Sequence, residues 1–301
     1  MPVLYIMGEG RSGSTLLDIV LSNLPGFVGV GELWTFLEND TSVTGKCSCG
    51  ATFHECDFWN DVREAVFERV GHRDLAEIRR VQKPHDQLRR LPVKLAGRAG
   101  PRFDEYCAYN TAVYEAILEV SGGTCVLDST KQVGRGFNLL QNPDLDVKLL
   151  HLVRDGRAVM WSRVRDLTRE PGLVRKGPMA TTAAWTIKNA MALQTGRRAG
   201  ERYLMVRYED FAANPVAELK RIGAYLGVEI EELIRTIEDG SSFTPGHQIG
   251  GNERARLNSK RVRLRPDMEW QKRLDPRHRR MFWRTSGWLA RHLGYSRMPS
   301  P

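Results

Sequence analysis

A short apolar run that leads directly into a glycine-rich loop constrains this chain more than any other feature. Residues 3–7 are apolar or aromatic, Gly8, Gly10 and Gly13 follow, and apolar side chains then recur at helical spacing as far as Pro25. This order predicts a strand, a turn and a helix, and the backbone N–H groups at the start of such a helix can bind a phosphate. The N-terminal region therefore indicates the first unit of an α/β fold with an anion-binding loop.

Further apolar runs at residues 27–30, 125–127, 147–153 and 203–206 predict the other strands. Strands that alternate with helices are joined by right-handed crossovers. We therefore predict an α/β fold of the P-loop type, in which a mainly parallel sheet lies between two layers of helices. Ligands of such a fold bind at the carboxyl ends of the strands.

The composition indicates the kind of partner and the compartment. A net charge of +9 favours an anionic partner, which includes nucleic acid, an anionic membrane surface and a small multiply charged ligand. The first residues lack the basic region and cleavage site of a secretory leader, and no run approaches the roughly 18 apolar residues of a membrane span. The cysteine count of five is odd and points to a reducing compartment, so we expect a cytoplasmic protein.

The glycine-rich loop departs from the common P-loop at one position. Gly8, Gly13 and Thr15 fit that frame, but Ser14 occupies the place of its lysine. In a nucleoside-triphosphate enzyme that lysine reaches the β- and γ-phosphates, so its loss removes the main charge clamp for a triphosphate. Backbone N–H groups can still hold a single phosphate, and Arg11 can supply a cation.

At this point the sequence resembles the sulfotransferases that use 3'-phosphoadenosine 5'-phosphosulfate (PAPS). Their 5'-phosphosulfate loop, in the branch acting on carbohydrates and protein tyrosine, is matched by Arg11, Ser12, Gly13, Ser14 and Thr15. These residues and the preceding Gly10 are the candidates for binding the donor. A second stretch resembles the 3'-phosphate motif of the family, in which an arginine and a serine eight residues later bind the donor. Here these residues are Arg154 and Ser162. The resemblance implies a PAPS site and no required metal.

A third stretch resembles the loop of bacterial members that folds over the nucleotide. It contains Gly251 and Asn252, with Arg254 and Arg256 shortly after. The usual proline after the asparagine is Glu253 here, so either arginine could be the phosphate ligand.

The chain has no low-complexity linker and no internal repeat, so we expect a single domain over residues 1–301.

Residues from about 60 to 120 are charged and helical in pattern, and we interpret them as a helical insertion near the acceptor site. Residues from about 241 to 266 are rich in arginine and predict a loop that covers the nucleotide. Pro276 and Gly294 mark the two ends of a predicted C-terminal helix.

Sulfuryl transfer needs a base for the acceptor proton and cations for the departing phosphate. Arg11 is the candidate for the leaving group. Glu32 is the candidate base, because the tyrosylprotein sulfotransferases have their catalytic glutamate in a similar layout; its alternative role is to cap a helix that starts near Leu33. Lys131 resembles a lysine that contacts the donor near the transferring group, and its alternative is an exposed loop lysine. The rival bases are the histidines His54, His85 and His151.

A cluster of sulfur and imidazole ligands follows the second strand. Cys47, Cys49, His54 and Cys56 could bind zinc, although the spacing of the first two is not the common C-x₂-C pair. A reduced-thiol loop or a local disulfide is the favoured interpretation, and we expect no metal.

Together these features predict a sulfotransferase that acts on a hydroxyl of a carbohydrate or a small natural product, with a tyrosine or phenol as an alternative acceptor. A P-loop kinase is the first rival, in which Asp128 would imitate a Mg²⁺ ligand. A nucleic-acid-binding module is the second, motivated by the charge, although no helix-turn-helix, zinc-finger or RNA-binding signature accompanies it.

Overall fold

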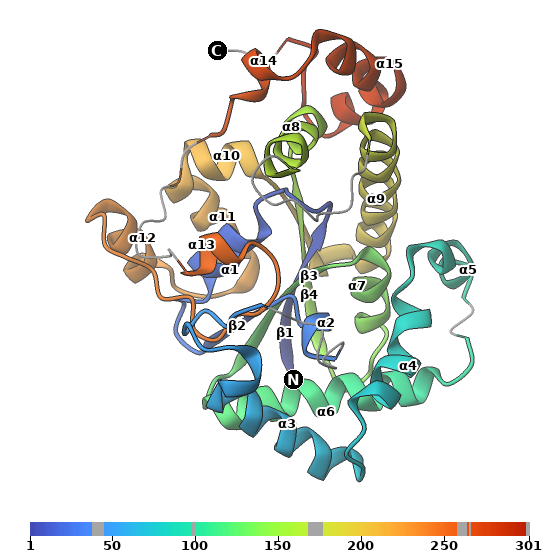
Figure 1. Ribbon diagram of the computed structural model, residues 1–301, viewed down its shortest axis with the longest axis vertical. Coiled ribbons are helices and arrows are strands. Elements are labelled where there is room, and N and C mark those ends of the chain that lie inside the picture. Colours follow the sequence, from blue (N-terminus) through green and yellow to red (C-terminus); the bar gives the residue numbers. More distant parts are fainter. Residues whose placement is uncertain (38–44, 98–99, 168–176, 258–263, 265, 299–301) are drawn as a thin grey trace.

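A parallel sheet forms the centre of the computed structural model, which describes residues 1–37, 45–97, 100–167, 177–257, 264 and 266–298 (Figure 1). The strands are β1 (Pro2–Gly8), β2 (Phe27–Gly31), β3 (Cys125–Lys131), β4 (Asp146–Val153) and β5 (Tyr203–Arg207). Their spatial order is β2-β3-β1-β4-β5, and every neighbouring pair is parallel. The predicted α/β fold and its strands are therefore confirmed.

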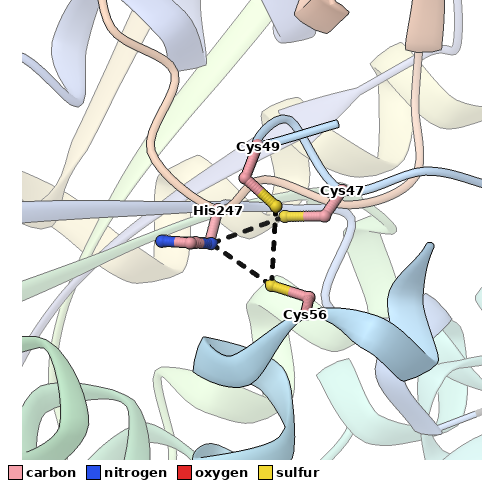
Figure 2. Close-up of side chains that lie close together, drawn as sticks. All are labelled: Cys47, Cys49, Cys56 and His247. Atoms are coloured by element: carbon pink, nitrogen blue, oxygen red, sulfur yellow. Dashed lines mark hydrogen bonds between the residues drawn. The ribbon is translucent and has the colours of Figure 1, made fainter. Parts of the chain in front are cut away.

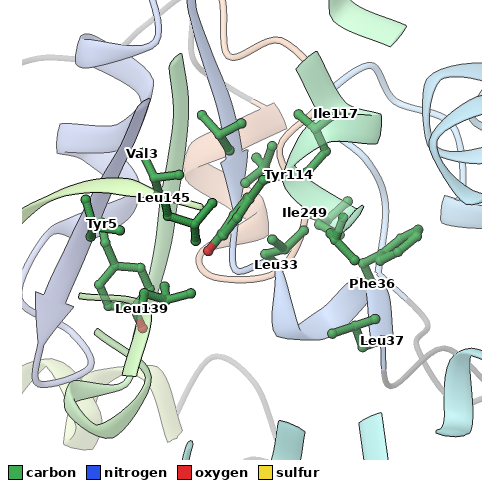
Figure 3. Close-up of a cluster of buried hydrophobic side chains, with 14 of the residues drawn as sticks. Val3, Tyr5, Leu33, Phe36, Leu37, Tyr114, Ile117, Leu139, Leu145 and Ile249 are labelled. Carbon is green, nitrogen blue, oxygen red and sulfur yellow. The ribbon is translucent and has the colours of Figure 1, made fainter. Parts of the chain in front are cut away.

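Strand β1 lies in the middle of the sheet, and alternate side chains face opposite layers. Val3, Tyr5 and Met7 join one apolar cluster, part of which Figure 3 shows. This cluster includes side chains from α6 (Phe103–Ser121), α7 (Val133–Leu139) and α9 (Pro178–Ala199). Leu4 and Ile6 face the other layer, formed by α1 (Ser14–Leu21), α10 (Tyr208–Ala213), α11 (Pro215–Leu226) and α12 (Glu231–Glu238). The sheet is thus covered on both faces, as a buried parallel sheet requires.

The segment predicted to be a helical insertion is helical. It holds α3 (Asp57–Val70), α4 (Leu75–Asp86), α5 (Leu91–Leu95) and α6, with short 3₁₀ turns at Phe53–Glu55 and Leu88–Arg90. Helix α6 packs against α3, α4 and β3. The insertion is therefore joined to the sheet through its longest helix.

A third cluster lies at the other end of the molecule, where α8 (Gly156–Leu167), α9, α14 (Trp270–Arg273) and α15 (Pro276–His292) meet around Trp185 and Phe282 (Figure 1). Helix α15 starts where Asp275 accepts a hydrogen bond from Arg277 N at 2.7 Å. It ends just before Gly294, as the sequence predicted.

Two elements differ from the sequence-based expectation. Strand β3 continues to Lys131, so residues 128–131 belong to the strand and not to a loop after it. The predicted covering loop contains a short helix, α13 (Glu253–Leu257), and Ile249 forms a parallel bridge with Gly31 at the end of β2. Residues 258–263 and 265 of that loop, and the segment 38–44 after α2 (Trp34–Leu37), lie outside the described residues. Among the helices in the described ranges, none combines the length and apolar character needed to cross a membrane.

Candidate active site

The glycine-rich loop joins the end of β1 to the start of α1, and two of its glycines are required by close backbone approaches. A Cβ at Gly8 would lie 2.4 Å from the carbonyl oxygen of Leu152 in β4, and a Cβ at Gly13 would lie 2.4 Å from the ring of Tyr208. Both positions also have a positive φ, of 150° and 94°. The tight loop therefore fits against β4 and α10 only where side chains are absent.

A buried carboxylate anchors this loop to the helices behind it. Glu9 pairs with Arg163 of α8, and its other oxygen lies 3.1 Å from Nζ of Lys188 in α9. Sequence reasoning missed this role, and the only available signal was a charged residue inside a glycine-rich run. The anchor fixes the backbone of the loop against α8 and α9.

The tip of the loop has features that suit an anion. Arg11 adopts a left-handed φ of 69°, and Ser12 is buried with a hydroxyl that has no hydrogen-bond partner in the described part of the chain. Ser14, also buried, is the first residue of α1. An unpartnered buried hydroxyl beside a helix N-terminus matches the needs of a phosphate group.

Glu32 and Lys131, which the sequence suggested separately, form an ion pair between Oε1 and Nζ. Glu32 follows β2 and Lys131 ends the neighbouring strand β3, so the carboxyl edge of the sheet brings them together. The other carboxylate oxygen accepts a hydrogen bond from the indole of Trp34 at 2.9 Å. The side chains are only 14% and 15% exposed, so Lys131 is not an exposed loop lysine.

Residues 249–257, called the covering segment below, lie over this ion pair and the start of α1. Glu32 N donates to the carbonyl of Ile249 at 2.8 Å, and Asn252 N donates to Thr15 Oγ1 at 3.2 Å. A Cβ at Gly251 would lie 2.8 Å from Thr15 Oγ1 and 3.1 Å from Glu32 Oε1, so these two oxygens are no more than 5.9 Å apart. The carboxylate therefore lies beside the phosphate loop.

A cavity of about 140 Å³ adjoins this region and is lined by Thr35, Lys46, Phe53, Gly250, Gly251 and Arg256, among others.

The two arginines of the covering segment have different surroundings. Arg256 is buried, and its Nη1 donates to the backbone carbonyls of Lys46 and Gln248, each at 2.8 Å. Arg254 is exposed on α13. The sequence could not choose between them as a phosphate ligand, and the two hydrogen bonds of Arg256 give it a structural role in the segment.

The second predicted motif meets the first at Arg154. Its Nη1 donates to the carbonyl of Arg11 at 3.1 Å, and its guanidinium lies 4.6 Å from the ring centre of Tyr208. Its Nη2 pairs with Asp267 at 3.2 Å. Burial alone would raise the pKa of Asp267, but Arg154 and Arg165 outweigh it and hold the pKa below its usual value. Ser162 is buried two turns along α8.

Asp18 is a buried acid that the sequence did not suggest. It lies on α1, where Oδ1 accepts a hydrogen bond from Gln248 Nε2 at 2.7 Å, and Ser129 of β3 also bonds its carboxyl group. Burial raises the pKa of Asp18 to about 7. A polar residue between Leu17 and Ile19 in an otherwise apolar stretch was the only sequence signal.

Two of the three rival bases have structural hydrogen-bond partners. His54 is exposed, and His85 bonds Pro101 O and Lys94. His151 bonds Tyr203 and Asn189 inside the core, and burial lowers its pKa to about 4.

Asp128, the imitation Mg²⁺ ligand of the kinase hypothesis, is fully buried. It accepts hydrogen bonds from Thr130 and Tyr114 and pairs with Arg135. Because its oxygens already have these partners, Asp128 is a poor candidate for a metal ligand.

Comparison with known proteins shows which proteins parts of this chain resemble. A sequence profile described as the sulfotransferase family matches residues 104–232. Carbohydrate sulfotransferase 6 of Homo sapiens is 29% identical over 160 residues, which cover 45% of this chain and 38% of the relative. Carbohydrate sulfotransferase 2 of Mus musculus is 32% identical over 184 residues, which cover 46% and 33%. Part of this chain, residues 104–232, is therefore similar to the sulfotransferase family.

Members of this family are enzymes, and solved structures support the same fold. The sulfotransferase domain from the curacin biosynthetic pathway superposes with a TM-score of 0.53 at 19% identity, covering 99% of each chain. The domain from the olefin synthase of Synechococcus PCC 7002 gives 0.50 at 21% identity, covering 99% of this chain and 96% of the other. The chain spans less than half the length of the two curated relatives named above, so their similarity concerns a part of each relative.

Proposed function

We propose that this chain transfers a sulfuryl group from PAPS to a hydroxyl group of a carbohydrate or a small natural product. The observation that carries this proposal is the position of the ion pair between Glu32 and Lys131. The Glu32 carboxylate lies no more than 5.9 Å from Thr15 Oγ1 of the phosphate loop. A proton acceptor and a cation thus adjoin the loop that suits the donor's 5'-phosphate, which is the set of groups that in-line sulfuryl transfer needs.

The proposed step breaks one S–O bond and forms another. The acceptor oxygen attacks the sulfur, the bond from sulfur to the 5'-phosphate oxygen breaks, and the electron pair stays on adenosine 3',5'-bisphosphate. Glu32 takes the acceptor proton, and Arg11 with the loop N–H groups stabilises the charge that develops on the phosphate. Protonation of Glu32 weakens its attraction to Lys131, which then assists the departing oxygen.

The 3'-phosphate of the donor is assigned to Arg154 and Ser162. Arg154 is connected to the phosphate loop through its hydrogen bond to the Arg11 carbonyl, and its buried Nε has no hydrogen-bond partner within the described residues. Arg154 and Arg165 both contact Asp267, so the region is rich in cations that could bind a dianion. Arg254 and Asn252 of the covering segment complete the proposed nucleotide site.

The acceptor class rests on the relatives and on the small cavity beside Gly251. Two relatives are named as carbohydrate sulfotransferases, which supports a sugar hydroxyl as the first acceptor to test. A tyrosine or phenol acceptor is the alternative within the same chemistry.

The decisive experiment is a transfer assay with ³⁵S-labelled PAPS across sugars, natural-product alcohols and phenols, run without added Mg²⁺. Label should pass to at least one hydroxyl, and Arg11→Ala should abolish most of that transfer. Binding of adenosine 3',5'-bisphosphate is measured in parallel. If the bisphosphate does not bind and the chain transfers phosphate from ATP and Mg²⁺, the kinase hypothesis replaces this proposal. If the bisphosphate does not bind and the chain binds a DNA duplex in a salt-sensitive manner, the nucleic-acid hypothesis replaces it.

A further inference from the structure

A histidine meets three cysteines from a distant part of the sequence beside the covering segment (Figure 2). They are Cys47, Cys49, Cys56 and His247, and their ligand atoms all lie within 4.8 Å of one another. His247 replaces His54, which the sequence had suggested as the fourth member; His54 is exposed and lies outside the group. The corrected set contains four side chains that bind zinc well as thiolates and neutral imidazole.

Three distances within the group are close to the edges of a tetrahedron around a zinc ion. Zn–S bonds of about 2.3 Å and Zn–N bonds of about 2.0 Å place two sulfurs about 3.8 Å apart and a sulfur and a nitrogen about 3.5 Å apart. Cys49 Sγ lies 3.7 Å from Cys56 Sγ. His247 Nδ1 lies 3.6 Å from Cys47 Sγ and 3.3 Å from Cys56 Sγ. We propose that these four residues bind one Zn²⁺ ion in a closed Cys₃His site.

The surroundings of His247 orient its Nδ1 toward the sulfurs. Its ring stacks on Phe58 with 4.7 Å between centroids and an interplanar angle of 14°. Its carbonyl accepts a hydrogen bond from the indole of Trp59 at 2.8 Å. These two contacts hold the ring of His247 beside the three cysteines.

A disulfide explains less of this geometry than a metal does. The sulfurs of Cys49 and Cys56 would have to approach from 3.7 Å to about 2.05 Å, and that bond would use only two of the four side chains. Cys47 would remain buried beside His247 without a function. Zinc uses all four ligands, and it leaves no open coordination position, so the site is structural and not catalytic.

The zinc site would strengthen the connection between two segments that are far apart in the sequence and that hydrogen bonds already join. Cys47, Cys49 and Cys56 belong to the loop before α3, while His247 precedes Ile249, which bridges to the end of β2. A backbone bond from Ser48 N to the Gln248 carbonyl, at 3.0 Å, runs in parallel. The ion would therefore hold in place the segment that covers Glu32 and Thr15.

Metal content is the direct test. The full chain, purified under reducing conditions without chelators and analysed by mass spectrometry of the elements, should carry about one zinc per chain. Cys56→Ser and His247→Ala should each lower that content at least tenfold. Cys125→Ser and His54→Ala are matched controls that alter a cysteine or a histidine outside the group and should leave the content unchanged.

A second measurement covers variants that fail to fold. Cobalt(II) exchanged into the wild-type chain should give the absorption of a tetrahedral ion with a thiolate-to-metal charge-transfer band. His247→Cys should retain the ion and increase that band by about a third, because four thiolates replace three. Wild-type protein with less than a tenth of an equivalent of zinc, or an intact mass that reveals a disulfide between Cys49 and Cys56, would overturn the proposal.

Discussion

Glu32 receives two interactions in the structure, from Lys131 and from the indole of Trp34, and a conservative change can remove its charge while keeping its shape. Glu32→Gln retains an amide oxygen for the indole but no longer accepts the proton of the acceptor. We expect the turnover number to fall by about 10²–10⁴-fold, the usual contribution of a general base. Steady-state ³⁵S transfer measures this change.

The control for this variant is its affinity for adenosine 3',5'-bisphosphate. Calorimetry should give the same dissociation constant for Glu32→Gln and the wild type, because the proposed role of Glu32 concerns the acceptor and not the nucleotide. An unchanged turnover number would remove Glu32 from the reaction.

The raised pKa of Asp18 makes the free energy of unfolding depend on pH. Burial raises its pKa from 3.8 to about 7, so the folded chain retains a proton that the unfolded chain has released between these pH values. The unfolded state therefore binds fewer protons, and the free energy of unfolding falls as the pH rises through this window. Between pH 5 and pH 8 the loss attributable to Asp18 is about 2–3 kcal/mol.

Asp18→Asn keeps the oxygen that accepts from Gln248 and removes the titration. Urea denaturation at pH 5 and pH 8 should give a smaller loss of stability for this variant than for the wild type. Parallel pH profiles of the two proteins would contradict the assignment.

At the scale of the elements, the covering segment depends on the absence of a side chain at Gly251. Alanine there would place its Cβ 2.8 Å from Thr15 Oγ1 and 3.1 Å from Glu32 Oε1, in addition to the strain of a φ of 66°. We expect Gly251→Ala to displace the segment and to weaken binding of adenosine 3',5'-bisphosphate by about tenfold or more, a loss of about 1.4 kcal/mol.

Gly240→Ala is the matched control for this prediction. Gly240 has a nearly equal φ of 64°, but nothing lies within 4 Å of its added Cβ. It should cost about 1 kcal/mol of stability through backbone strain and leave nucleotide affinity unchanged. Equal effects of the two variants on affinity would show that the covering segment is not sensitive to this contact.

The sequence predicted the strands well because each is an apolar run with a clear boundary, but it placed the end of β3 too early. Lys131 was expected after the strand and is its last residue. Glu32 and Lys131 were each found by resemblance, whereas their ion pair depends on the adjacency of β2 and β3. His247 could not be predicted as a partner of Cys56, because 191 residues separate them and no local pattern marks the histidine.

At the scale of the whole molecule, one buried arginine connects the helical insertion to the sheet. Arg135 lies 3.4 Å from Asp128 of β3 and 3.7 Å from Asp86 of α4, and it donates to Tyr114 of α6 at 3.2 Å. Removing one partner of a buried ion pair leaves uncompensated charges, which costs about 3–5 kcal/mol. We expect Arg135→Leu to lower the free energy of unfolding by this amount in chemical denaturation.

Arg80→Leu provides the comparison for an exposed ion pair. Arg80 contacts Glu77 on the surface of α4, with 65% of its side chain exposed. Its replacement should change stability by no more than about 0.5 kcal/mol. A small effect of Arg135→Leu, similar to that of Arg80→Leu, would mean that the insertion is held by its apolar contacts alone.

The strand order has a consequence for how the chain is made on the ribosome. Strands β1 and β2 precede the other strands of this sheet in the sequence but are not paired with each other; each is hydrogen-bonded to β3, which begins only at Cys125. Neither strand can therefore pair in the sheet until the nascent chain extends to Cys125. During that interval the apolar runs at residues 3–7 and 27–30 have no sheet to enter, so the growing chain depends on helix formation, or on a chaperone, to keep them from aggregating.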